Sequence, residues 1–288
     1  MEAAEIDDTL FLIDRALAED IGTGDVTTAW TIPSEGRGSA HFIAKQTGII
    51  AGLDVVHMTF DRIDPELGFS AFIQEGAVVE PGQVFAEVHG PTRGLLSGER
   101  VALNFIRHLS GIATLTNRYV AAVAGTGAAI IDTRKTTPGF RLLEKAAVRA
   151  GGGVNHRFGL YDMILIKDNH IAAAGGLTEA VTRCVEKLRS MQLELRIEVE
   201  TATMEQVKEA LATPVDRIML DNMSVSEMND AVKLIRASVI QRRPVEIEAS
   251  GAITLERVRE VAETGVDLIS IGAITHSAPA LDISLDII

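Results

Sequence analysis

Short apolar runs, each followed at once by a polar, charged or glycine position, recur along the second half of the chain. Most of them are separated by segments with the period of about 3.6 residues that marks amphipathic helices, and runs of this length are typical of buried strands. The runs are Ala128–Ile131, Met163–Ile166, Leu195–Val199, Ile218–Leu220, Val245–Ala249 and Leu268–Ile271. This alternation predicts repeated β-α units around a parallel sheet.

The positions that follow these runs carry most of the candidate chemistry. They are Asp132–Lys135, Lys167–His170, Glu200, Asp221-Asn222, Ser250-Gly251 and Gly272. When parallel strands close into a barrel, their C-terminal ends converge on one face, and this face holds the active site of barrel enzymes. We therefore expect these residues to line one mouth and to form an active site.

The first part of the chain follows a different pattern. A helical period from Asp8 to Glu19 precedes short strand-like pieces, which are separated by glycine and proline. A long helical region runs from Ser97 to about Ala124, and we expect it to break near Gly111. The strand-like pieces are Ala40–Lys45, Gly48–Gly52, Phe69–Ile73 and Gln83–Val88.

These patterns predict an α/β protein with two closely packed domains. We expect a smaller N-terminal α+β sandwich domain over residues 1–110 and an open TIM-like α/β barrel over residues 111–277. The C-terminal tail, residues 278–288, is expected to pack on the N-terminal domain. Within the barrel, Pro138 fits the first turn of a helix that ends at Gly151, and Ser224 with Glu227 has the spacing of a capping box.

Composition narrows the class of protein. With 288 residues, 47% hydrophobic content and a mean hydropathy of +0.19, the chain is long enough for one large core and one smaller domain. It shows neither the roughly 18 apolar residues of a membrane helix nor the pattern of a signal peptide. A net charge of −13 argues against a nucleic-acid partner, and the single cysteine, Cys184, fits a reducing compartment. We therefore expect a cytoplasmic protein with neither a membrane nor a nucleic-acid partner.

The positive charges are nevertheless concentrated. Seven Lys or Arg residues lie between Arg134 and Lys167, against two acids, Glu144 and Asp162. Such a cluster in an acidic protein is costly unless an anion occupies it, so we expect an anionic ligand. Three of the seven fit a solvated helix face equally well: Arg141, Lys145 and Arg149.

Several stretches occur in an order that resembles one enzyme family, the quinolinate phosphoribosyltransferases. They are DTRKTTPGFR (132–141), GGGVNHRFGLYDMILIKDNH (151–170), EVE (198–200), LDN (220–222), EASG (248–251) and GVDLISIGAITHS (265–277). These enzymes, the decarboxylating nicotinate-nucleotide pyrophosphorylases, act in NAD biosynthesis. The resemblance covers nearly the whole chain, and it departs from the pattern at Ala252, where many members carry glycine. We expect this methyl group to crowd a bound phosphate without abolishing its binding.

The resemblance implies a cationic wall for quinolinate, a pyridine with two adjacent carboxylates. Guanidinium groups suit this ligand because they bind planar carboxylates bidentately. The matched residues are Arg134, Lys135, His156, Arg157 and Lys167, together with Arg100, which family members donate from a neighbouring subunit. The resemblance thus also implies a homodimer, or a dimer-based hexamer, with shared active sites.

A second set of residues matches the family's site for phosphoribosyl pyrophosphate. Lys135, Glu200 and Asp221 are the implied catalytic residues, and the two acids are the implied ligands of Mg²⁺, the expected cofactor. Carboxylates near the anomeric carbon also stabilise an oxocarbenium-like transition state. An ion pair with Lys135 or Lys167 is an alternative role for each acid. A phosphate cradle completes the set: Ser250, Gly251, Gly272 and His276.

Three other functions stay open from the sequence. A paralogous phosphoribosyltransferase associated with molybdate-transport loci shares several of the motifs and would use another pyridine acid. Retention of Arg134, Arg157 and Lys167 favours quinolinate over that substrate. A barrel lyase would use Lys135 or Lys167 for a Schiff base, although a lysine among many cations is more simply an anion ligand. A non-catalytic anion-binding protein would not need the pair of acids.

Overall fold

The computed structural model describes residues 3–238 and 244–288, and its contacts divide the chain into two compact units. The first unit comprises Met1–Asn117, Thr136–Gly152 and Ala273–Ile288, and the second comprises Arg118–Lys135 and Gly153–Gly272. Each unit is therefore assembled from separate stretches of the chain. The domains expected from the sequence, residues 1–110 and 111–277, are continuous stretches, and these limits stay a prediction.

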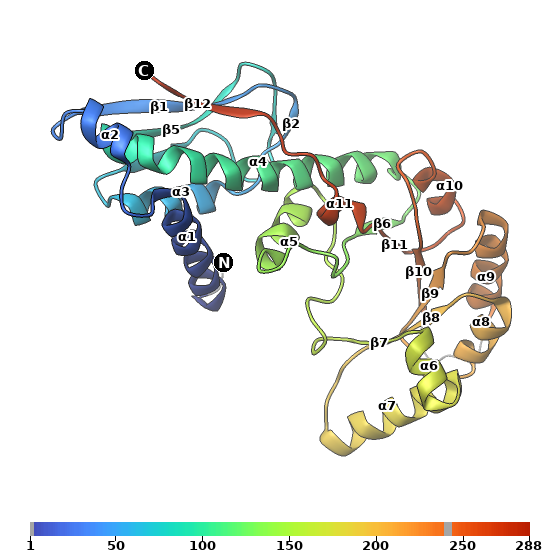
Figure 1. Cartoon of the computed structure of the whole chain (residues 1–288). Coiled ribbons are helices and arrows are strands. Elements are labelled where there is room, and N and C mark those ends of the chain that lie inside the picture. The colour runs from blue at the N-terminus through green and yellow to red at the C-terminus, as the bar shows by residue number, and fades with distance from the viewer. Residues whose placement is uncertain (1–2, 239–243) are drawn as a thin grey trace. The chain divides into compact units, whose positions relative to one another are not determined.

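The first unit is built on a four-stranded antiparallel sheet with the order β12-β1-β5-β3 (Figure 1). Its strands are β1 (Arg37–Ala44), β3 (Gly68–Ala71), β5 (Val84–Pro91) and β12 (Ile283–Ile287). A small ribbon pairs β2 (Gly48–Ile49) with β4 (Val78–Val79). Strand β12 pairs with β1 in the register Ala40↔Ile287, so the C-terminal tail completes this sheet.

Helices complete the first unit, whose core is aromatic. They are α1 (Ala3–Ile21), α2 (Val26–Thr31), α3 (Leu53–Ile63), α5 (Arg141–Ala150), α11 (Ala273–His276) and most of α4 (Thr92–Ala122). The ring of Phe42 lies 6.3 Å from that of Phe60 and 5.9 Å from that of Phe85, and all three side chains are fully buried. The core thus joins strands β1 and β5 to helix α3 through aromatic contacts.

The second unit contains a six-stranded parallel sheet, and each of its strands falls within or beside a run that the sequence predicts. The strands are β6 (Ala129–Ile131), β7 (Ile164–Ile166), β8 (Ile197–Thr201), β9 (Arg217–Asp221), β10 (Glu246–Ser250) and β11 (Leu268–Ser270). Their order is β6-β11-β10-β9-β8-β7. The last strand pairs with the first, as in a closing barrel, whereas β6 and β7 lie at the two edges. The sheet is therefore an open α/β barrel, and this confirms the predicted fold class.

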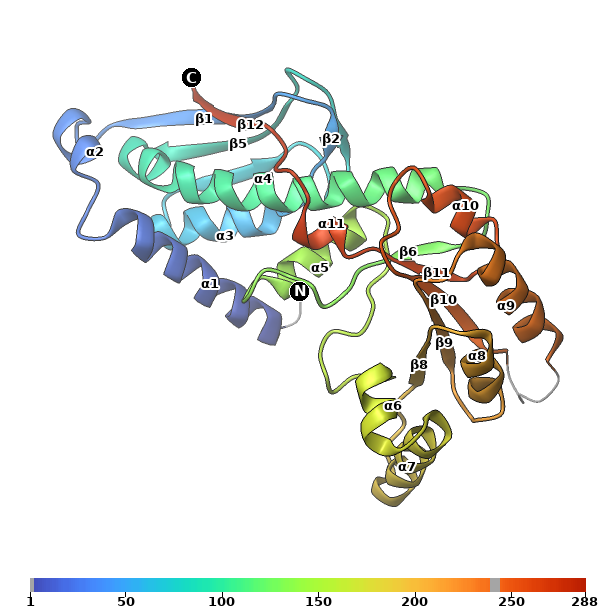
Figure 2. The same ribbon diagram turned by 45° about the vertical axis from the view of Figure 1, so that its right-hand side comes forward.

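Helices accompany this sheet, and α8 and α9 run along one side of strands β8 to β10 (Figure 2). The helices are α6 (Asp168–Ala174), α7 (Leu177–Met191), α8 (Met204–Leu211), α9 (Val225–Ala237) and α10 (Val258–Ala262). Helix α9 begins with the predicted capping box, in which Ser224 accepts a hydrogen bond from Glu227 N–H and Glu227 accepts one from Ser224 N–H. This cap fixes the helix that starts just after Asp221 and Asn222.

Two local predictions are wrong. Helix α4 continues through Gly111, because this glycine permits close packing instead of a break. A Cβ atom there would overlap the carbonyl oxygen of Pro279 and lie 3.1 Å from Ala280 Cα. Pro138 lies in the turn before α5, which begins only at Arg141, so it is not a first-turn proline; Gly151 ends α5 as predicted.

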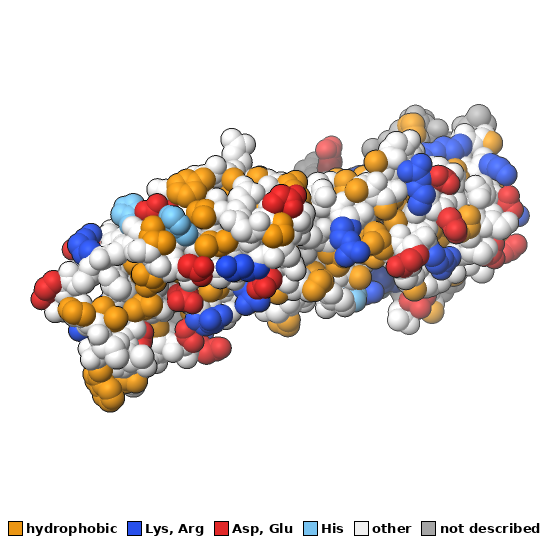
Figure 3. Space-filling model, turned by 90° about the horizontal axis from the view of Figure 1, so that it is seen from above, with side chains coloured by type: hydrophobic (Ala, Val, Ile, Leu, Met, Phe, Trp, Pro, Cys, Tyr) orange, Lys and Arg blue, Asp and Glu red, His pale blue; other side chains and the backbone are white. Residues whose placement is uncertain are grey.

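Two surface properties bear on the expectations from composition. In the residues that the structure describes, no helix combines the length and the apolar character required to cross a bilayer. Acidic and basic side chains are interspersed over the face shown in Figure 3, so the net negative charge is not gathered into one patch on that face.

Candidate active site

Parallel pairing places the candidate acids and the serine on neighbouring strand ends. Ser250 pairs with Asp221, and Thr201 pairs with Leu220, so Glu200, Asp221 and Ser250 lie at the C-terminal ends of β8, β9 and β10. Side chains two residues apart on a strand share a face. Glu198 therefore projects from the same face as Glu200, one layer deeper in the sheet.

The outer layer contains an ion pair between neighbouring strands. Lys167 follows β7, and its Nζ lies 2.8 Å from Glu200 Oε2, with Glu200 only 16% exposed. The ion pair considered for Glu200 in the sequence is thus present.

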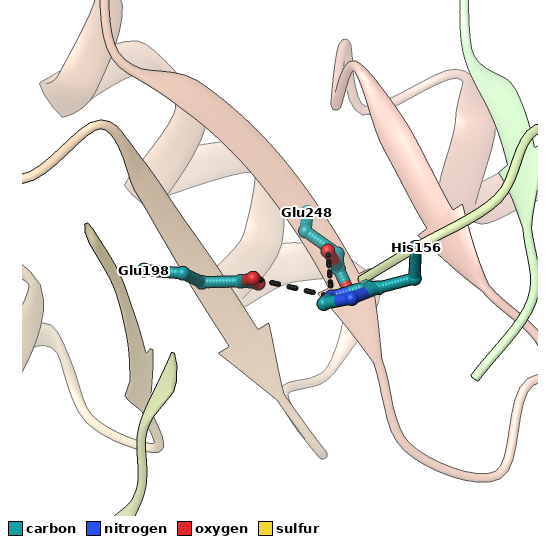
Figure 4. A group of neighbouring side chains, drawn as sticks. All are labelled: His156, Glu198 and Glu248. Carbon is teal, nitrogen blue, oxygen red and sulfur yellow. Dashed lines mark ion pairs between the residues drawn. The ribbon is translucent and has the colours of Figure 1, made fainter. Parts of the chain in front are cut away.

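A buried ionic cluster lies beneath this layer (Figure 4). The Nε2 atom of His156 is 3.1 Å from Glu198 Oε2 and 3.3 Å from Glu248 Oε2, and both carboxylates are completely buried. Arg217 Nη1 lies 2.9 Å from Glu248 Oε2 and 3.6 Å from Glu198 Oε2. Its Nη2 is 2.7 Å from Glu246. Two cations, His156 and Arg217, thus face the two buried carboxylates that come from β8 and β10.

The carboxylates control the ionisation of the histidine. Burial by itself would lower the pKa of His156, but the hydrogen bonds and charges of Glu198 and Glu248 outweigh burial and raise that pKa to about 9. Burial, reinforced by the charge of Glu248, raises the pKa of Glu198 to about 7. For Glu248, burial is opposed and outweighed by His156, which together with its other partners lowers the pKa.

One contact opposes this charge state. The N–H of Arg157 lies 2.7 Å from His156 Nδ1, an arrangement that favours a neutral ring with its proton on Nε2. Two buried carboxylates at contact distance outweigh a single contact between adjacent residues, so we assign the imidazolium. His156, Glu198 and Glu248 could also group around a metal ion. Arg217 and protonated His156 already balance their charge, and we assign the group as an ion-pair cluster.

The arginines of the predicted quinolinate wall come from two loops that Asp132 ties together. The fully buried carboxylate of Asp132 accepts hydrogen bonds from Asn155 Nδ2 at 2.6 Å and from His156 N–H at 2.9 Å. Burial and then the nearby charge of Arg134 lower the pKa of Arg157. The guanidinium of Arg157 also donates to Met163 O at 3.0 Å, and the positive charges of the two arginines suit an anionic ligand.

The other cationic residues of the stretch 134–167 lie in different environments. Lys135 lies in the same loop, where its N–H donates to Thr133 Oγ1. Lys145, on α5, is 1% exposed, so the solvated helix face considered for it is wrong, whereas Arg149 is exposed. Arg141 donates to Thr136 Oγ1.

The phosphate-cradle residues lie at strand ends with unusual backbone angles. Gly251 has φ +100° and Ala252 has φ 47°, directly after β10. Ala252 thus occupies a left-handed conformation that glycine adopts more easily, which explains why glycine suits this position. Gly272 follows Ile271, whose N–H donates to Ile131 O between β11 and β6.

Arg100 and His276 belong to the first compact unit, whereas the other predicted site residues belong to the second. Arg100 lies on α4 with its side chain 54% exposed, 3.9 Å from Glu99. His276 ends α11, and its Nδ1 is 2.6 Å from Ser277 Oγ. Within the second unit, the structure brings Lys167 to Glu200 and places Asp221 beside Ser250.

Four residues of the site received no role from the sequence: Glu198, Glu248, Arg217 and Asn222, of which only Asn222 was expected at the mouth. A signal for the first three exists, since charged residues recur at alternate positions of consecutive predicted strands, where apolar side chains normally fill a barrel. For Asn222 the residue pattern gives no comparable signal. Its role depends on a left-handed backbone conformation, with φ 55°, which the sequence does not show.

Comparisons with known proteins agree over nearly the whole chain. Residues 25–110 match a family model described as quinolinate phosphoribosyl transferase, N-terminal domain, and residues 112–286 match the model of the C-terminal domain of that transferase. A nicotinate-nucleotide pyrophosphorylase [carboxylating] of Arabidopsis thaliana, described as chloroplastic, is 47% identical over 96% of this chain and 82% of its own length. A probable enzyme of that name from Synechocystis is 48% identical over 96% of this chain and 91% of its own length.

Solved structures give the same result. The nicotinate-nucleotide pyrophosphorylase from Francisella tularensis superposes with a TM-score of 0.91 at 38% sequence identity, covering 98% of this chain and 96% of that one. A structure from Ehrlichia chaffeensis with the same enzyme name gives a TM-score of 0.88 at 36% identity, covering 100% of this chain and 99% of that one.

Proposed function

This chain belongs to the quinolinate phosphoribosyltransferase family, and from this premise we propose that it joins quinolinate to phosphoribosyl pyrophosphate. The products are nicotinate mononucleotide, carbon dioxide and pyrophosphate, as de novo NAD biosynthesis requires. The observation that carries the proposal is the placement of Glu200, Asp221 and Ser250 at neighbouring strand ends, with Lys167 paired to Glu200. A cationic residue suited to binding the dicarboxylate and acids suited to the ribose thus lie at strand ends of one sheet.

The cationic residues bind and orient the pyridine. Arg134 and Arg157 hold its two carboxylates, with Lys135, Lys167 and a neighbouring subunit's Arg100 adding positive charge. His156, next to Arg157 in the chain, completes the proposed wall, and its own charge is balanced by Glu198 and Glu248. The positive charges of Arg134 and Arg157 suit an anionic ligand, so the site favours a dianion over a neutral ring.

The reaction follows from this orientation. The pyridine nitrogen attacks the anomeric carbon, the bond to pyrophosphate breaks, and the ring nitrogen becomes cationic. This cation accepts the electron pair left at C2 when its carboxylate departs as carbon dioxide, and C2 then takes a proton. Glu200 and Asp221 stabilise the positive charge that develops on the ribose, and Lys135 holds pyrophosphate oxygens.

Mg²⁺ is the proposed cofactor. The carboxylates of Glu200 and Asp221 project from adjacent strand ends, and hard oxygen ligands of this kind suit the ion. When bound, it neutralises pyrophosphate charge. Ser250, Gly251, Gly272 and His276 are proposed to hold the phosphates through small residues and backbone N–H groups.

We propose a homodimer, or a dimer-based hexamer, as the active form. The family resemblance implies that Arg100 acts in a neighbour's site. Exposed apolar side chains on α1 and α2 support a contact between subunits, since Phe11 is 68% and Trp30 is 84% exposed. A cytoplasmic location is proposed from the composition and the single cysteine.

Two variants test the separate roles of cations and acids. Arg134→Ala should weaken quinolinate binding by roughly 1.5–3 kcal/mol, the range for hydrogen bonds to charged groups, and should change the KM for quinolinate most.

Glu200→Gln should lower kcat while leaving the quinolinate KM close to that of the wild type. Arg183→Ala, which removes an exposed ion pair on α7, is the matched control. Unchanged quinolinate affinity in folded Arg134→Ala protein, or full turnover by Glu200→Gln, would contradict these roles.

A further inference from the structure

Asn222 lies where the ends of β9 and β10 meet. Its φ of 55° is left-handed, a conformation that asparagine tolerates better than most residues. Its N–H donates to Ser250 O at 3.0 Å, so the backbone of the β9 end is tied to the β10 end. The residue therefore adopts an uncommon conformation at the junction of two proposed ligand-binding segments.

The side chain of Asn222 touches both segments. Its Nδ2 donates a 2.6 Å hydrogen bond to Asp221 Oδ2. On the other side it packs against Gly251, because a Cβ atom on that glycine would overlap Asn222 Oδ1 and lie 2.7 Å from Asn222 N. The amide thus occupies the space between the Asp221 carboxylate and the turn after β10.

The turn itself is held in a costly conformation. Gly251 and Ala252 both have positive φ, and Ala252 is not a glycine. Backbone of this kind persists only where surrounding contacts enforce it, and it is concentrated at functional sites. The contacts of Asn222 with Ser250 and Gly251 help to enforce it here.

We propose that Asn222 is a positioning residue that sets the Asp221 carboxylate and the Ser250–Ala252 turn in one fixed arrangement for phosphoribosyl pyrophosphate. By donating to Oδ2, the amide fixes the carboxylate's rotation and leaves Oδ1 directed to ligand. The inference rests on the proposed function for the identity of that ligand. Outer partners that orient a ligating carboxylate affect affinity strongly even though they do not touch the ligand.

Asn222→Gly is the direct test, because glycine tolerates the positive φ while the side chain that contacts Asp221 and Gly251 is removed. We expect the Kd for phosphoribosyl pyrophosphate with Mg²⁺, measured by titration calorimetry, to rise about 10–100-fold. The Kd for quinolinate should stay within about 2-fold of the wild type. Gln192→Gly is the matched control, since Gln192 also has φ 55° but caps α7. Its binding constants should be unchanged, and thermal unfolding should show that both variants are folded.

A double-mutant cycle tests whether the effect passes through Asp221. In an Asp221→Asn background, adding Asn222→Gly should weaken phosphoribosyl pyrophosphate binding by much less than it does in the wild type. Full affinity in Asn222→Gly, an equal loss of quinolinate affinity, or the same fold-change in both backgrounds would overturn the inference. A wild-type protein that binds neither compound would overturn the proposed function and the inference with it. Normal wild-type turnover with an unaffected Asn222→Gly variant would overturn the inference alone.

Discussion

At the scale of single residues, the ionisation of His156 follows from the two carboxylates beneath it. Glu198 and Glu248 are completely buried, and each lies within 3.3 Å of His156 Nε2. Removing one partner of a buried ion pair leaves an uncompensated charge, so loss of any one member of this cluster should destabilise the folded protein.

This cluster predicts a fall in stability with rising pH. The pKa of His156 is about 9 in the folded protein, above its ordinary 6.5, so its stabilisation is complete below pH 6.5 and is lost as pH rises through 9. The pKa of Glu198 is about 7, above its ordinary 4.5, so this group also loses stabilisation as pH rises from 4.5 through 7. Since one pKa unit corresponds to about 1.4 kcal/mol, we expect His156 to account for at most about 3 kcal/mol. Urea unfolding at a series of pH values measures the effect.

The control for this prediction is His156→Gln, which removes the histidine proton. The free energy of unfolding of this variant should depend less on pH between 6.5 and 9 than that of the wild type. An identical pH dependence in the two proteins would show that His156 is not the titrating group.

Much of the site could be predicted at this scale, but not its lower layer. The motifs placed Glu200, Asp221 and Ser250 at strand ends, and the structure has them there. Glu198 and Glu248 stand inside the same motifs, yet their partner Arg217 comes from the strand between them. That contact depends on the register of three strands, which local sequence does not determine.

At the scale of elements, α4 shows how a glycine serves packing inside a helix. Residues 279–281 run against this helix, where Leu281 N–H donates to Arg107 O at 2.9 Å. Gly111 permits the approach, since any Cβ there would overlap Pro279 O. The sequence shows a helix-weakening residue, and only the position of a distant segment shows why it is present.

Gly111→Ala should therefore destabilise the protein although alanine is the better helix former. The expected loss is about 1–3 kcal/mol, because the added methyl group meets backbone atoms that cannot rotate away. Asn104→Ala, at an exposed position of the same helix, should instead stabilise it by roughly 0.5 kcal/mol. Denaturant unfolding measures both, and a Gly111→Ala variant as stable as Asn104→Ala would contradict the packing role.

The elements that were predicted and those that were missed differ in a physical way. Strands β6 to β11 contain apolar runs, so the local sequence pattern is enough to locate them. Helix α3 begins where Glu75 accepts hydrogen bonds from Gly52 N–H and Leu53 N–H, more than twenty residues away. Strand β12 forms by pairing with β1 from the opposite end of the chain. Such elements depend on contacts that a local pattern does not contain.

At the scale of the whole molecule, the residues that the family resemblance assigns to the site are divided between the two compact units. Arg100 and His276 belong to the first, and the cationic loops and acidic strand ends belong to the second. The family resemblance assigns Arg100 to the site of a neighbouring subunit. In a two-fold dimer, each of the two equivalent sites would then combine Lys135 of one chain with Arg100 of the other.

Mixing two inactive variants tests this shared site. Arg100→Ala and Lys135→Ala proteins should each be nearly inactive, and subunit exchange should restore up to about a quarter of wild-type activity, because half the dimers are hybrids with one intact site. Mass spectrometry of differently labelled subunits verifies exchange. If exchange is complete and no activity returns, the two residues do not act across a subunit boundary.

The central claim is tested most directly by following all products of the purified protein. With quinolinate, phosphoribosyl pyrophosphate and Mg²⁺, we predict nicotinate mononucleotide, pyrophosphate and carbon dioxide in equal amounts. Omission of any one of the three should abolish the reaction, and nicotinate should not replace quinolinate, because the proposed cationic wall of Arg134 and Arg157 suits two carboxylates. Folded protein that forms none of these products, or that uses nicotinate equally well without releasing carbon dioxide, would contradict the proposed function.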